Sequence, residues 1–212
     1  PAKNIITLSG DIAKDVTYKV RNLVHNETTV RPPAPFITSS LQASASTVLG
    51  FAAKRTMRAA QALYEGIRIR GEGQVGLITY MRTDSMNISG DAIASVRSFI
   101  GEKFGDAYLP EQPRFYRSSN KSAQEAHEAI RPTDVGKHPD TLKASMNEDQ
   151  KRLYGLIWSR FVACQMTAAR WHRTEIFFER EDESTGAIFK VGGRTLAFEG
   201  FYKASGVPSS DT

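Results

Sequence analysis

Residues 76–85, GLITYMRTDS, place a tyrosine, an arginine and an aspartate directly after an apolar run. Tyr80 and Arg82 are two positions apart, so on a β-strand both side chains would point to one face. A phenol ionises only near pH ~10, so as a nucleophile it needs a neighbour that stabilises the charge developing on its target. An arginine fork suits a phosphate. Asp84 either orients that guanidinium or caps the next turn with Ser85. The pattern is compatible with phosphoryl transfer to tyrosine, and also with a cross-strand surface pair, which is the commoner case.

A second candidate group lies in residues 122–135, SAQEAHEAIRPTDV. In a helix, Gln124, His127 and Arg131 would be three and four residues apart, which puts an amide, an imidazole and a guanidinium on one face. Such a face can clamp a phosphate. The alternative is a solvated helical face on which the two glutamates of the segment pair with basic neighbours.

A third feature is the basic stretch KRTMRAAQALYEGIRIR, residues 54–70. A surface of this kind can follow a nucleic-acid backbone, although charged helical faces are usually only solvated. Its cations, set against the single acidic residue Glu65, are Lys54, Arg55, Arg58, Arg68 and Arg70.

The composition limits the classes of function. The chain has 212 residues and is 40% hydrophobic, enough for one large or two small domains with real cores. A net charge of +5 and a pI near 9.4 favour an anionic partner. Cys164 is the single cysteine and the histidines show no ligand spacing, so we predict no disulfide and no metal site in this chain.

The chain contains no apolar run of the roughly 20 residues that a membrane span needs, and it shows no signal peptide at its start. We therefore expect a cytoplasmic protein with no membrane partner. The start at Pro1 and the polar tail SGVPSSDT predict a piece of a longer protein.

The elements that must position these residues follow the order strands, helices, strands. Residues 4–31 predict short strands, and PPAP at 32–35 predicts a domain boundary. This order predicts a helical domain inserted between two halves of a β domain. The sequence predicts helices over 38–50, 53–65, 89–105, 122–132 and 147–166, a hairpin-like turn over 66–76, a loop over 106–121, and strands over 75–80, 173–180, 186–191 and 194–204.

Taken together, several long motifs resemble those of the bacterial topoisomerase I family, a group of the type IA DNA topoisomerases. The resemblance spans roughly residues 30–170 and continues more weakly to about 203. Met81, within YMRTDS, is typical of the topoisomerase I group. The motifs, in the family's order and spacing, are PFITSSLQ, GFAAKRTMRAAQALYEG, GLITYMRTDSMNIS, SAQEAHEAIRPTDV and LIWSRFVACQMT.

The resemblance implies a chemistry for these residues. Type IA enzymes cut one DNA strand by attack of a tyrosine, pass another strand through the gap and reseal it, without ATP. By match to the motifs, Tyr80 is implied as the nucleophile, Arg82 as the residue that positions the scissile phosphate, and His127 as a phosphate contact. The further residues that we expect to contact DNA or phosphate are Arg131, Gln124, Asp84, Thr83, Arg58 and Lys54.

The resemblance also implies an architecture, a multi-domain α+β fold. A mostly helical domain similar to a winged-helix or catabolite-activator fold, residues 32–167, would be inserted between the halves 1–31 and 168–212 of a β-rich arch.

The family holds Mg²⁺ in a TOPRIM domain, whose D-x-D-x-E motif does not occur in this sequence. We therefore expect the chain alone not to relax DNA. Its expected partners are single-stranded DNA near the nucleoid, the TOPRIM domain, the domain that completes the gate, and the C-terminal DNA-binding modules.

Two rival hypotheses stay open. In one, the chain is a DNA-binding module in which Tyr80 only stacks on bases, as aromatic residues beside basic grooves often do. In the other, it is a structural hinge without affinity for single strands. Trp158, Phe161, Trp171 and Cys164 are predicted as core, because they sit in or beside apolar runs.

Overall fold

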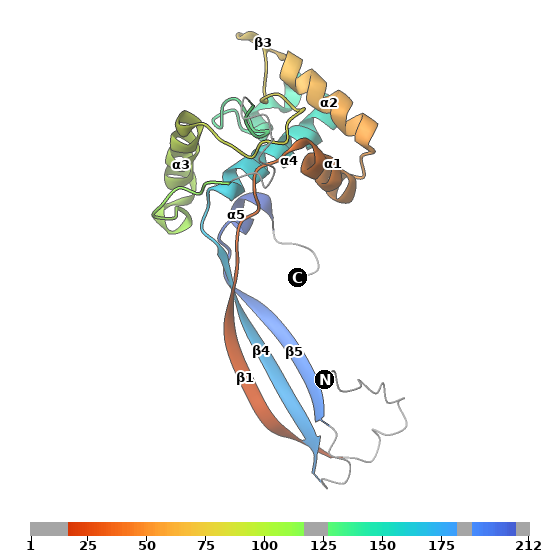
Figure 1. Cartoon of the computed structure of the whole chain (residues 1–212), viewed down its shortest axis with the longest axis vertical. Coiled ribbons are helices and arrows are strands. Elements are labelled where there is room, and N and C mark those ends of the chain that lie inside the picture. Colours follow the sequence, from red (N-terminus) through yellow and green to blue (C-terminus); the bar gives the residue numbers. More distant parts are fainter. Residues whose placement is uncertain (1–16, 117–126, 182–187, 207–212) are drawn as a thin grey trace. The chain divides into compact units, whose positions relative to one another are not determined.

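The computed structural model describes residues 17–116, 127–181 and 188–206. These residues fall into two compact units, which Figure 1 shows with the chain coloured along its length. One unit takes the residues up to Thr29 and Arg170–Ala197, and the other takes Val30–Ala169 and the residues from Phe198 on. The fold is a mixed α+β fold. The assignment of 32–167 as a tyrosine domain within a split arch remains a prediction.

The first unit is a three-stranded sheet with the order β1-β4-β5. Its strands are β1 (Tyr18–Val30), β4 (Ala169–Arg180) and β5 (Ile188–Phe198). The prediction of separate strands over 186–191 and 194–204 was wrong, because β5 runs unbroken through Gly192 and Gly193. A glycine weakens a strand but leaves the backbone ladder available. The several short strands expected before residue 31 are, in the described part, the single strand β1.

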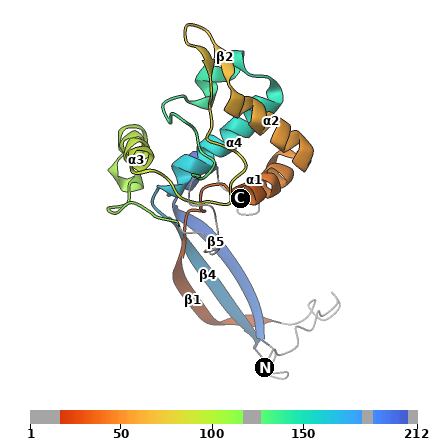
Figure 2. The same cartoon turned by 45° about the horizontal axis from the view of Figure 1, so that its top comes forward.

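The second unit is built around one long helix, α4 (Glu148–Cys164). Its inward face is fully apolar over Leu153, Ile157 and Phe161, each at most 2% exposed. Figures 1 and 2 both show α4 between α3 and the pair α1 and α2. Trp158 and Cys164 are buried as predicted. The remaining α-helices of the described chain are α1 (Thr38–Ser44), which continues as a π-helical turn to Leu49, α2 (Ala53–Glu65), α3 (Gly90–Phe104) and the short α5 (Tyr202–Ser205). The 3-10 helices Asp106–Tyr108 and Pro139–Ser145 lie between α3 and α4.

Local signals fix where these helices begin and end. Asn147 and Gln150 form a reciprocal capping box at the start of α4, where the sequence predicts that a helix begins. Gly50 ends the α1 segment with a φ of 69°, a left-handed conformation that glycine adopts without strain. The hairpin expected after α2 is present as β2 (Ile67–Ile69) paired antiparallel with β3 (Gly73–Val75).

Three sequence-based expectations differ from the structure. Residues 75–80 do not form a strand: beyond Val75 they make only an isolated bridge between Ile78 and Pro132. The helix predicted over 122–132 is wrong from residue 127 on, where the chain is extended and Ile130 bridges Phe36. Residues 202–205 are helical rather than a strand. In each case contacts distant in sequence override the local pattern.

Candidate functional site

The segment before Tyr80 is held by backbone hydrogen bonds to two other parts of the helical unit. The amide of Leu77 donates to the carbonyl of Leu63 at the end of α2, at 2.8 Å. The amide of Thr79 donates to the carbonyl of Arg131 (2.9 Å), and the amide of Thr133 donates to the carbonyl of Leu77 (3.0 Å). Residues 129–133 therefore lie alongside residues 77–79. The backbone that carries Tyr80 is therefore fixed on both sides without belonging to a regular strand.

Side chains alternate along the polar segment, although it is not a regular strand. Met81, Thr83 and Ser85 are buried, with at most 7% exposure. Between them, Arg82 and Asp84 are exposed. An extended backbone keeps the two-residue period. Arg82 and Asp84 therefore face away from the core.

Tyr80 lies between two aromatic rings that come from different elements. Tyr64, at the end of α2, meets it edge-on with the ring centroids 5.3 Å apart. His127 lies 5.4 Å from it on another side, with the ring planes tilted by 42°. The phenol is half-buried. The structure thus brings together Tyr80 and His127, which are 47 positions apart in the sequence.

An open groove of about 470 Å³ runs past this cluster. Its lining comes from the start of α1, from the polar segment and from His127. The groove combines a guanidinium, an imidazole and hydroxyl groups, which suits an extended anionic ligand such as a nucleic-acid strand. Tyr80 is not among its lining residues and meets it through the ring of His127. Its lining residues are Ile37, Thr38, Ser39, Gln42, Arg82, Thr83, Asp84 and His127.

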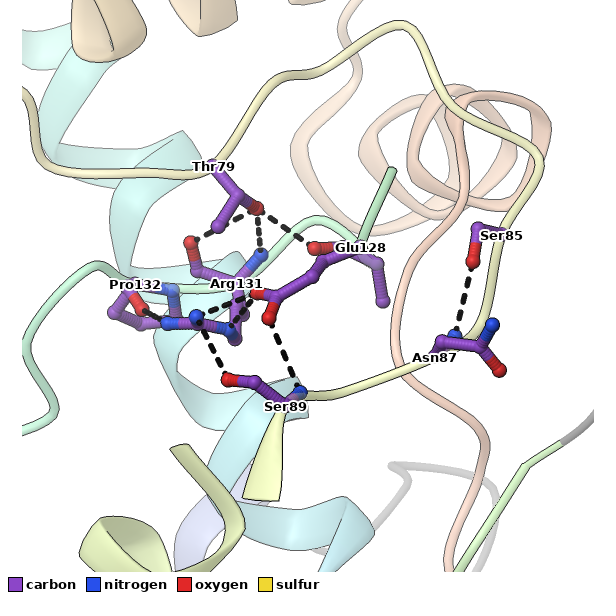
Figure 3. Close-up of polar contacts among 8 residues, drawn as sticks. Thr79, Ser85, Asn87, Ser89, Glu128, Arg131 and Pro132 are labelled. Atoms are coloured by element: carbon purple, nitrogen blue, oxygen red, sulfur yellow. Dashed lines mark hydrogen bonds and ion pairs between the residues drawn. The ribbon is translucent and has the colours of Figure 1, made fainter. Parts of the chain in front are cut away.

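Arg131 is engaged inside the protein (Figure 3). Its Nε donates to Glu128 at 2.7 Å and one Nη donates to the carbonyl of Pro132 at 2.9 Å. Glu128 in turn accepts from the amide of Ser89, at the start of α3. Only 13% of the Arg131 side chain is exposed. In this arrangement Arg131 joins the residues around His127 to α3, and a phosphate would have to displace Glu128 to bind it.

The remaining expected contacts are distributed differently. Lys54 and Arg58 are exposed on α2, and neither lines the groove that contains Arg82 and His127. Arg58 lines a second groove of about 230 Å³ together with Arg55. Arg55 binds Asp149 through two hydrogen bonds of 2.9 and 2.6 Å, which holds the pKa of that carboxyl below its usual range. Gln124 lies outside the described residues.

Sequence reasoning did not find two residues that shape this site, Tyr64 and Thr38. Tyr64 stands at the end of a helix in an ordinary apolar pattern, and its contact with Tyr80 arises only because the β2–β3 hairpin returns the chain. Thr38 is one of three consecutive hydroxyl residues, TSS at 38–40, at the start of α1. Its hydrogen-bond partners Met81 and Thr83 are 43 and 45 positions away in the sequence, so no local pattern predicts these bonds.

Neither a metal cluster nor a membrane-spanning helix is found in the part of the chain that the structure describes. No three His, Cys, Asp or Glu residues among those described are placed to hold an ion. No helix there is long and apolar enough to cross a membrane.

Comparisons with known proteins agree with one another. A family model described as DNA topoisomerase matches residues 3–212. DNA topoisomerase 1 of Rickettsia felis is 47% identical over 198 residues, which are 90% of this chain and 25% of that protein. The Campylobacter jejuni enzyme of the same name is 43% identical and covers 95% of this chain and 28% of its own length. The chain thus spans about a quarter of the length of these relatives.

One solved structure extends the similarity to three dimensions. The full-length topoisomerase I from Thermotoga maritima aligns with a TM-score of 0.81 at 35% sequence identity. The aligned region covers 95% of this chain and 32% of the other.

Proposed function

Since the chain belongs to the bacterial DNA topoisomerase I family of type IA enzymes, we propose that it supplies the nucleophile and the phosphate-binding side of the DNA-cleavage site. The observation that carries this proposal is the position of Tyr80 against His127, beside a groove that Arg82 lines. A tyrosine that only packs against its surroundings does not require such neighbours. A phenol that attacks a phosphodiester needs both an anchored phosphate and stabilisation of its charge.

The reaction transfers a phosphoryl group. The Tyr80 Oη attacks the phosphorus of the scissile phosphodiester, the bond from phosphorus to the 3′ oxygen breaks, and the phenolic proton ends on that 3′ oxygen. The products are a 5′-phosphotyrosine and a free 3′-hydroxyl. Arg82 binds the non-bridging oxygens as charge builds on them, and His127 holds a neighbouring phosphate. The reverse attack by the 3′-hydroxyl reseals the strand and restores the phenol.

Strand passage between these two steps relaxes negatively supercoiled DNA. The strain of the supercoil drives the change, so no ATP is required. Within this scheme, residues 32–167 act as the tyrosine domain, similar to a winged-helix or catabolite-activator fold, between the two halves of a β-rich arch. Single-stranded DNA is the ligand, and the protein works in the cytoplasm at the nucleoid.

Magnesium belongs to the TOPRIM domain in this scheme. The described residues include no cluster of three potential ligands, so they do not fit an Mg²⁺ site. The groups that assist departure of the 3′ oxygen would come from TOPRIM, together with the gate-completing and C-terminal DNA-binding domains as further partners. We therefore expect the isolated chain not to relax plasmid DNA.

The proposal is tested by covalent capture. The chain is incubated with end-labelled single-stranded DNA and Mg²⁺, with and without a separately produced TOPRIM domain, and denatured. We expect a denaturant-resistant adduct when TOPRIM is present, and its loss in Tyr80→Phe. DNA affinity should change little in this variant, which separates a nucleophile from a residue that only stacks on bases, because stacking leaves no covalent product.

Tyr64→Phe is the matched control, since it removes a hydroxyl from the ring next to Tyr80 while keeping the aromatic contact. It should form the adduct as the unmodified chain does. An adduct that persists in Tyr80→Phe, or that disappears only in Tyr64→Phe, would contradict the assignment.

A further inference from the structure

We propose that Thr38 is a positioning residue that aims Arg82 into the groove. This inference rests on the proposed function, because it concerns how the cleavage site is held. Thr38 is the first residue of α1 and lines the same groove as Arg82. It touches the backbone on both sides of Arg82.

Four hydrogen bonds join Thr38 to that segment. Its hydroxyl donates to the carbonyls of Met81 (2.8 Å) and Thr83 (3.0 Å) and accepts from the amide of Thr83 (2.9 Å). Its own amide donates to the carbonyl of Thr83 at 2.9 Å. The last bond also satisfies a donor that the first turn of α1 cannot satisfy internally.

These bonds fix the residue between them. Met81 is 1% exposed and Thr83 is 7% exposed, so both flanking side chains are also locked in the core. Arg82 is the exposed residue between two anchored neighbours, and its Cα position and initial direction follow from theirs. Because Thr38 and Arg82 line the same groove, the residue that anchors the backbone beside Arg82 is itself part of the site.

The chemistry of the contact restricts what can replace threonine. Serine keeps a hydroxyl that both donates and accepts, whereas valine has the same shape and can do neither. In Thr38→Val, the amide of Thr83 loses the one side-chain acceptor found for it among the described residues. A backbone group left without a partner in a part-buried site moves to find one, and Arg82 would move with it.

The first measurement uses the chain alone and does not depend on cleavage. The affinity for a single-stranded oligonucleotide is measured by fluorescence anisotropy over a series of salt concentrations. One phosphate contact contributes about 0.7 to the slope of log affinity against log salt for a single strand. Arg82→Ala should lower this slope by about that amount. Thr38→Val should lower it by part or all of the same amount, and Thr38→Ser should leave it unchanged.

The second measurement is the rate of adduct formation with the TOPRIM domain present. We expect Thr38→Val to slow it about 10- to 100-fold, since a displacement of about 1 Å in a reacting group has effects of that order. Thr38→Ser should restore it. Thr56→Val is the matched control, because the one hydrogen bond found for the buried Thr56 hydroxyl among the described residues is donated locally, to the carbonyl of Ala52 at the start of α2. It should leave the rate unchanged.

A double-mutant cycle separates positioning from simple loss of stability. If Thr38 acts through Arg82, adding Thr38→Val to Arg82→Ala produces no further loss of rate or slope. Additive losses, an unchanged slope in Thr38→Val, or failure of Thr38→Ser to restore activity would overturn the inference. Absence of any adduct in the unmodified chain would refute the proposed function, and the salt slopes would still decide whether Thr38 positions Arg82.

Discussion

Replacing Arg131 with alanine separates two roles for this residue, a phosphate contact expected from the sequence and an internal link found in the structure. Arg131→Ala removes the ion pair with Glu128 and the bond to the carbonyl of Pro132. Both bonds have the charged guanidinium as donor, and a charge-assisted hydrogen bond is worth about 1.5–3 kcal/mol, of which we take the lower end for each. With 13% of the side chain exposed, solvent screens this pair little. We expect the free energy of unfolding to fall by about 3 kcal/mol.

The assay follows one of the chain's two tryptophans, Trp158, which is buried in the helical unit. Trp171→Phe provides the background in which Trp158 alone reports unfolding in urea or on heating. A loss of about 3 kcal/mol corresponds to a fall in Tm of about 6–12 °C for chains of about 150–250 residues. Glu128→Gln should lose less, because an amide oxygen still accepts hydrogen bonds. If Arg131→Ala leaves stability within about 0.5 kcal/mol and lowers the salt slope of DNA binding by about 0.7, Arg131 binds phosphate and the internal role is refuted.

Three further predictions concern packing and titration. Gly76→Ala should destabilise the helical unit by about 1–3 kcal/mol in urea unfolding, because its Cβ would lie 2.8 Å from the carbonyl oxygen of Tyr64. Gly90→Ala, which meets no atom within 4 Å, is its control and should be neutral. Burial raises the pKa of the Cys164 thiol to about 12, so the native chain should resist a thiol reagent at pH ~8 and react only when unfolded. Burial also raises the pKa of Tyr154 above its ordinary value. The folded state therefore holds the Tyr154 proton more tightly than the unfolded state, and the stability that this difference contributes is complete below pH ~10 and is lost as the pH rises above it. Tyr154→Phe should lessen the alkaline loss of stability measured by urea unfolding.

The sequence predicts the elements whose signals are local. Asn147 and Gly105 place the start of α4 and the end of α3 within a residue or two. Gly192 and Gly193 mislead for the same reason. They resemble a turn locally, but the ladder of β4 beside them continues past both, and a strand with a ready partner tolerates glycine.

The candidate site shows the same limit at the level of single residues. His127 was placed near Arg131 by helical spacing, yet the described chain there is extended, so that spacing does not explain its position. His127 reaches Tyr80 because Ile130 bridges Phe36 and Thr79 pairs with Arg131, contacts across 94 and 52 positions of sequence. The motif points to a histidine that lies against Tyr80, while the local helical pattern predicts the wrong backbone geometry for it. Residues 129–133 pair with the backbone just before Tyr80 and follow closely after His127 in the chain. The same short segment therefore positions both side chains.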